Sequence, residues 1–190
     1  HLLENGFSLL FGAYYFQDEN LYKKAKEILE KELNEQILDD GAHFELSPMY
    51  HQLMLFRVLD CINLVQNNSW KNNELLKFLE EKASRMLGWL RNISYKNGEI
   101  PLLNDSANCI VPSSNELFTY ANNLKLNTQN LKLSQSGYRK IKKENYECIA
   151  DVGEVGASYI PGHVHADTFN VELYVNNKPF IVDTGLSTYN

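Results

Sequence analysis

The sequence has few cysteines, an excess of acidic over basic residues and no long apolar run. Its 190 residues include three cysteines, Cys61, Cys109 and Cys148, which lie far apart and form no CxxC pair. Neither a zinc knuckle nor a disulfide framework is therefore indicated. Lys and Arg total 18 against 24 Asp and Glu, for a formal net charge of −6. This balance disfavours nucleic acid as a partner, because phosphate binding needs a basic surface.

Apolar residues make up 44 % of the chain, enough for a real core. No apolar run reaches the ~20 residues that a membrane span needs. The chain starts at His1 inside an apolar-periodic pattern and stops at Asn190 just after a strand-like run. We therefore expect a piece of a longer protein, in which a missing signal peptide carries no information about location.

The first half of the chain has apolar residues at helical spacing. Asp18 and Ser47 are predicted N-caps, and Pro48 occupies the first helical position, where its missing N–H does no harm. Asp40-Gly41 marks a turn. Helices joined by short loops predict antiparallel pairs, as in a bundle or an α/α toroid. The predicted helices cover residues 1–16, 18–38, 47–66 and 73–93.

The second half has the pattern of short strands. The expected strands are "GYRKIKK", "YECIADVG", "TFNVELYV" and "PFIVDTG", with a hairpin turn at Asn176-Asn177. An antiparallel sheet, the first part of a sandwich, is the simplest interpretation. The predicted fold class is therefore α+β and multidomain. We predict a helical domain over residues 1–110, a connector over 111–130 and a sheet domain over 131–190.

Two histidines, His163 and His165, stand one residue apart before the third strand. Residues i and i+2 of a strand share a face, so the imidazoles can project together. Counting out from the Asn176-Asn177 turn pairs Asp183 with about Asn170, so the segment after His165 must bend back for His165 to meet Asp183. Two imidazoles and a carboxylate suit zinc, or non-haem iron when one face stays open. Surface histidines on a loop are the alternative.

The stretch "DDGAHFELSPMYH" crowds His43, Glu45, Tyr50 and His51 around a turn and a helix start. Backbone N–H groups and the dipole at a helix N-terminus favour a phenolate, and a tyrosine with a lowered pKa acts as a general base and acid. Tyr50 is therefore a catalytic candidate, and Glu45 and His51 are candidate substrate contacts. The alternative is an aromatic ring that packs under a loop.

Two further clusters are candidates for the same site. His1 and Glu4 share a helix face at i, i+3, where a carboxylate can orient an imidazole. Asn104 and Asp105 follow an apolar run in "GEIPLLNDSA" and are placed to line a cleft as substrate contacts. An ordinary helical pair and a capped turn are the respective alternatives.

Five stretches in this order resemble the heparinase II/III family of polysaccharide lyases: "HLLENGFSLLF", "DGAHFELSPMYH", "GEIPLLNDSA", "PGHVHAD" and "PFIVDTGLSTY". The resemblance spans nearly the whole chain. It implies the end of an N-terminal (α/α) toroid followed by the start of an antiparallel β-sandwich, with both domains truncated here. It also implies a periplasmic or secreted protein that cleaves uronic-acid polysaccharides by β-elimination.

The resemblance assigns roles residue by residue. His1 matches a position that neutralises the uronate carboxylate or exchanges protons, and Glu4 matches an acidic neighbour. Tyr50 matches the catalytic tyrosine, as base, acid or both. His163 matches a sandwich histidine that reaches into the cleft.

A structural zinc site is implied in the same way. His165 and Asp183 match two of its ligands, and the third is expected beyond Asn190. His163 would then face the cleft while His165 binds the metal. Strand alternation alone does not allow this, because it places both histidines on the same face. A bulge or loop after "PG" is needed to turn them apart.

Other functions stay open at this point. His163, His165 and Asp183 also suit a 2-His-1-carboxylate oxygenase. A glycan-binding or capsule-assembly protein that kept the lyase fold is a second alternative, and a plain structural domain is a third. The chain has four arginines, which favours a lightly sulfated or unsulfated substrate. The oligomeric state is not indicated.

Overall fold

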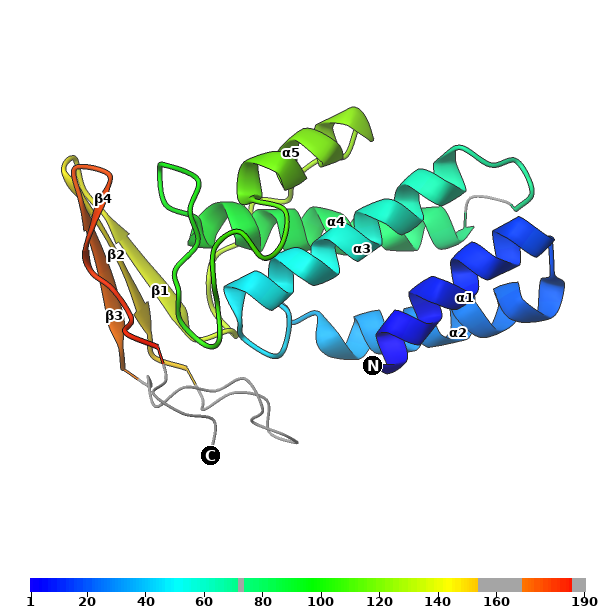
Figure 1. Ribbon diagram of the computed structural model, residues 1–190, viewed down its shortest axis with the longest axis horizontal. Coiled ribbons are helices and arrows are strands. Elements are labelled where there is room, and N and C mark those ends of the chain that lie inside the picture. Colours follow the sequence, from blue (N-terminus) through cyan, green and yellow to red (C-terminus); the bar gives the residue numbers. More distant parts are fainter. Residues whose placement is uncertain (72–73, 154–168, 186–190) are drawn as a thin grey trace.

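The computed structural model describes residues 1–71, 74–153 and 169–185. Helices come first and strands second, as predicted (Figure 1). Four long helices run alternately to and fro, with α1 paired against α2 and α3 against α4. Within the described residues, the helices lack the length and apolarity that crossing a membrane requires. The helices are α1 (Leu2–Phe16), α2 (Glu19–Gln36), α3 (Pro48–Gln66), α4 (Glu74–Ile93) and α5 (Ser114–Asn123).

The helix ends follow the predicted caps. The Asp18 carboxylate accepts hydrogen bonds from the backbone N–H groups of Asn20 and Leu21. The Ser47 hydroxyl accepts one from the N–H of Tyr50, with Pro48 in the first turn of α3. Each cap satisfies N–H groups that the helix leaves unpaired.

Helix α5 was not predicted. It lies inside residues 111–130, which the sequence pattern had indicated as a connector, and it packs on α3 and α4. Ser113 and Glu116 form a reciprocal capping box at its start. That S-x-x-E pattern was the sequence signal for this helix.

The strands form one antiparallel sheet in the order β1-β2-β3-β4, at one end of the helices (Figure 1). Asn176 and Asn177 both have positive φ, as the two-residue hairpin between β3 and β4 requires. A register shift between Leu173 and Tyr174 pairs Leu173 with Ile181. The strands are β1 (Tyr138–Lys142), β2 (Tyr146–Asp151), β3 (Val171–Val175) and β4 (Lys178–Ile181).

The sheet turns its more polar face toward the helices. On β3, Glu172 and Tyr174 are buried, whereas Val171 on the other face is 38 % exposed. Buried and less buried side chains therefore alternate along β3. The face carrying the carboxylate is the one that meets the helical part.

One continuous core joins the two parts. Trp89 of α4 is fully buried, and its ring lies 4.5 Å from that of His51 and 5.8 Å from that of Tyr138. The Asp40 carboxylate in the turn after α2 accepts hydrogen bonds from the Ser134 and Ser136 N–H groups, at 2.9 and 3.0 Å. Apolar packing and buried hydrogen bonds therefore both hold β1 against the helices.

Candidate functional site

Tyr50 lies in the first turn of α3, where two loops meet. Its backbone N–H donates to the Ser47 hydroxyl at 3.3 Å. That hydroxyl lies 3.1 Å from the Ser106 hydroxyl, which also accepts from the N–H of Met49 at 3.2 Å. The helix start is thus tied to the loop that carries Asn104 and Asp105.

The electrostatic surroundings of Tyr50 differ from the expectation. Its pKa is raised, first by burial and then by the negative charges of Asp105 and Glu45. The sequence predicted that the helix N-terminus would favour the ionised phenolate of Tyr50. The raised pKa shows that this prediction is wrong. A partly buried phenol beside two carboxylates stays protonated at neutral pH. Glu45 and Asp105 therefore lie near enough to Tyr50 to influence its ionisation.

His51 is buried in the core beneath the loop. It is 1 % exposed, its Nδ1 accepts from the backbone N–H of His43 at 3.2 Å, and its Nε2 lies 3.0 Å from the Met86 carbonyl. These partners require Nδ1 to accept and Nε2 to carry the proton. Burial lowers its pKa to about 4, so the ring is neutral. This arrangement gives His51 a structural role, and we do not keep it as a substrate contact.

His43 is also enclosed by the loop. It is 3 % exposed, and its Nε2 lies 3.2 Å from the Gln36 side-chain oxygen. Its Nδ1 lies 4.0 Å from the Glu45 carboxylate. The two histidines therefore shape the loop from which Glu45 faces the site.

Asn104 bridges the helical part and the sheet. It is 2 % exposed, and its Nδ2 donates to the Tyr138 hydroxyl and to the Asp151 carboxylate, each at 3.0 Å. The Tyr138 hydroxyl donates in turn to the Leu46 carbonyl at 2.7 Å. Leu46 has φ 59°, a left-handed conformation that costs free energy in a residue with a Cβ.

The bridge fixes the backbone directly before Ser47 and α3. The amide nitrogen of Asn104 thus donates to protein groups, and the expected contact of this residue with substrate stays a prediction. Asn104 influences the site through the Leu46 loop. Sequence reasoning missed Tyr138 and Asp151, because their partners lie 92 and 47 residues away along the chain.

His1 and Glu4 lie farther along the helices. Glu4 pairs with Arg57 at 3.6 Å, and both side chains are about two-fifths exposed. Arg57 follows Tyr50 by seven residues, or about 10 Å of helix at 1.5 Å per residue. The start of α1 therefore sits about two turns from Tyr50 along α3, with His1 exposed at its end.

The candidate metal ligands are described only in part. His163 and His165 lie outside the described residues. Asp183 follows β4, and its carboxylate accepts from the N–H of Gly185 at 3.1 Å. Counting on from the Leu173–Ile181 pair, the residue expected opposite Asp183 across the strands becomes Val171 rather than Asn170. Among the described residues, no three His, Cys, Asp or Glu side chains gather as a metal site, and the zinc prediction stays a prediction.

Glu172 is a second buried link between the sheet and the helical part, also missed from the sequence. It is fully buried and accepts from the Tyr95 hydroxyl at 3.0 Å and from the N–H groups of Leu102 and Asp183 at 3.1 and 3.2 Å. Burial raises its pKa. The Tyr95 ring stacks on that of Tyr174 at 3.7 Å. Glu172 therefore ties the loop after α4 to the exit of β4.

Together, the fold and the site define a class of two-part α+β proteins. In this class a helical domain meets an antiparallel sheet, and a tyrosine and acidic side chains lie where the domain and the sheet join. A family model described as "Heparinase II/III N-terminus" matches residues 15–133, and one described as "Heparinase II/III-like, C-terminal" matches residues 126–190. The chain belongs to the heparinase II/III family.

Individual relatives agree with this assignment. A heparin-sulfate lyase of Bacteroides stercoris is 24 % identical over 110 residues, which is 56 % of this chain and 16 % of that protein. A heparinase III gene product has a similar structure, with a TM-score of 0.77 and 19 % identity over 99 % of this chain and 33 % of that one. A mutant of the heparan sulfate lyase HepC from Pedobacter heparinus has a TM-score of 0.72 and 20 % identity, over 95 % of this chain and 32 % of that one. This chain thus spans about a third of these solved structures, and the likeness to them shows the fold.

Proposed function

We propose that the protein is a polysaccharide lyase that cleaves uronic-acid-containing glycans by β-elimination. The observation that carries the proposal is the family match across both domains, with Tyr50 at their junction. Described relatives are heparin or heparan sulfate lyases, which supports a glycosaminoglycan substrate. The small number of arginines favours a lightly sulfated or unsulfated one.

The reaction breaks the C5–H and C4–O bonds of the uronate and forms a C4–C5 double bond and an O–H bond on the leaving oxygen. A base removes the C5 proton of the uronate, the C4–O glycosidic bond breaks, and a C4–C5 double bond forms. A donor group binds the uronate carboxylate to stabilise the charge that spreads into it. An acid protonates the leaving oxygen.

Tyr50 is suited to the acid step. Its raised pKa keeps the phenol protonated, ready to donate to the leaving oxygen. Acting as the base requires its ionised form, which becomes more abundant as the pH rises. His163 and His1 are the proposed groups for the uronate carboxylate and for proton exchange.

Zinc, if bound, would involve His165 and Asp183 and would hold the loop rather than take part in chemistry. A further ligand is expected beyond Asn190. An acidic polysaccharide is the proposed partner, and a periplasmic or secreted location follows from the proposed substrate.

The test uses the absorbance of the unsaturated uronate product. The protein is incubated with a panel of uronic-acid polysaccharides, beside Tyr50→Phe and the control Tyr15→Phe, whose side chain is 83 % exposed on α1. We expect product from the wild type and the control and a loss of about 100-fold or more in Tyr50→Phe. Glycan binding without product in the wild type would favour the non-catalytic alternative.

A further inference from the structure

A basic groove lies away from Tyr50, between the edge strand β1 and the segment that leads into it beside α4. Its volume is about 410 Å³. The residues that matter here are Lys132, Arg139, Lys140 and Lys142, with the amides of Asn92 and Asn130. None of the described residues lining it carries a carboxylate. This is a local exception in a chain with a net charge of −6.

One nearby carboxylate offsets only part of this charge. Glu147 is 5 % exposed, and its Oε1 lies 3.1 Å from the Lys140 ammonium and 3.7 Å from that of Lys142. Its Oε2 accepts from the backbone N–H of Lys96 at 2.8 Å. Burial alone would raise the pKa of Glu147, but these donors outweigh it and lower the pKa. One buried negative charge against four cations leaves the groove about +3.

Hydrogen bonds hold the walls of the groove. The Asn92 amide donates to the Leu131 carbonyl, and the N–H of Gln129 donates to the Ser84 carbonyl at 3.1 Å. The Arg139 guanidinium donates to the carbonyls of Tyr138 and Ser134 at 2.8 and 3.3 Å. Groups fixed in this way lose less entropy when an anion binds.

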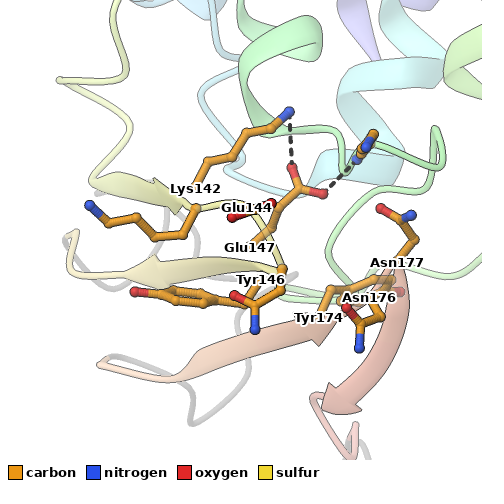
Figure 2. A pocket seen from close by; sticks show the side chains of 10 residues that line it. Lys142, Glu144, Tyr146, Glu147, Tyr174, Asn176 and Asn177 are labelled. Atoms are coloured by element: carbon orange, nitrogen blue, oxygen red, sulfur yellow. Dashed lines mark hydrogen bonds and ion pairs between the residues drawn. The ribbon is translucent and has the colours of Figure 1, made fainter.

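Lys142 also lines a second hollow at the β1–β2 turn. Lys96 and Lys143 help to form it, together with the carboxylates of Glu144 and Glu147 (Figure 2). The two hollows therefore meet at Lys142. We call Lys96, Lys132, Arg139, Lys140, Lys142 and Lys143 the basic track. An extended chain with repeated negative charges matches such a track better than a single small anion does.

The end of the basic track at Lys142 lies away from the loop that holds the Tyr50 site. Tyr138, which contacts the Leu46 loop, starts β1, and Lys142 ends it. Four residues of strand place Lys142 about 13 Å from Tyr138, at ~3.3 Å per residue. A long polymer can reach both surfaces, whereas a short oligosaccharide held at Tyr50 occupies one.

We propose that the basic track is an accessory binding site for the acidic polysaccharide, outside the catalytic site; the glycan class rests on the proposed function. The groove of about 410 Å³ has no aromatic lining among the described residues, whereas Tyr146 and Tyr174 line the second hollow, so the groove alone lacks the stacking surface of a single-stranded nucleic-acid site. The track would raise affinity for long chains by adding contacts to those in the cleft.

The test compares two triple variants of the whole protein. Lys132→Gln, Arg139→Gln and Lys142→Gln remove three exposed charges from the track. The matched control removes three exposed charges elsewhere, by Lys23→Gln, Lys31→Gln and Lys77→Gln on α2 and α4. Binding of size-defined heparan sulfate chains is titrated at several salt concentrations, and cleavage of a tetrasaccharide is followed by product absorbance.

We expect the track variant to bind long chains about tenfold or more weakly, with a shallower salt dependence, and the control to stay within about twofold. Tetrasaccharide cleavage stays unchanged in both. Equal binding by the two variants overturns the proposal, as does an equal loss for single-stranded DNA of matched charge, which indicates a general polyanion patch. If the track variant loses binding and no form of the protein cleaves, the accessory site stands and the lyase proposal fails.

Discussion

The hydroxyl of Tyr138 should stabilise both the fold and the site, and Tyr138→Phe removes that hydroxyl alone. The side chain is fully buried, and its ring keeps its packing on Trp89 at 5.8 Å. The lost atom donates to the Leu46 carbonyl at 2.7 Å and accepts from Asn104 at 3.0 Å. At about 1 kcal/mol for each buried hydrogen bond, we expect a loss of about 2 kcal/mol.

The assay is urea unfolding, in which the midpoint should fall by about 1 M for an m-value of ~2 kcal/mol/M. Tyr15→Phe, on an exposed side chain, should shift stability by less than about 0.5 kcal/mol. A second readout is the rate of glycan cleavage. Because Leu46 directly precedes the cap of α3, kcat should fall about tenfold or more with little change in KM. A stability within about 0.5 kcal/mol of wild type would refute the claim that this bridge holds the loop.

Two further predictions concern buried acidic groups. Glu172→Ala should destabilise by about 3 kcal/mol or more in denaturant unfolding, because it leaves the buried Tyr95 hydroxyl and two part-buried backbone N–H groups without their acceptor. Glu172→Gln keeps one oxygen and should cost about 1 kcal/mol, and equal losses from the two variants would contradict this account. Burial raises the pKa values of Tyr14 and Tyr120 to about 12 and also raises that of Tyr22. The raised pKa values stabilise the folded state. This stabilisation is fully present below pH ~10, the pKa of tyrosine in the unfolded chain, and is lost as the pH rises toward 12. Melting temperatures should therefore drop between pH 10 and 12, and a melting temperature that stays constant over this pH range would oppose the prediction.

Local sequence signals predicted most of the fold. Asp18, Ser47 and Pro48 set the starts of α2 and α3 because a cap needs only the next few residues. Asn176-Asn177 set the hairpin because a two-residue turn needs two positive φ angles. The capping box of α5 was equally local, and its helix was missed because polar residues surround it.

The site depended on residues distant in the chain. Burial raises the pKa of Tyr50, and Asp105, 55 positions away in the sequence, adds to this rise against the local effect of the helix N-terminus. His51 has the residue type of a substrate contact, yet packing against Trp89 buries it.

The sequence by itself therefore determined the elements, their order and the candidate tyrosine, since these follow from periodicity and turn chemistry over a few residues. Tertiary structure alone decided that Glu172 is buried, that Asn104 and Tyr138 hold Leu46, and that the cations of β1 line a groove. Burial, hydrogen bonding and electrostatic coupling depend on distances in space, which no local pattern along the chain specifies.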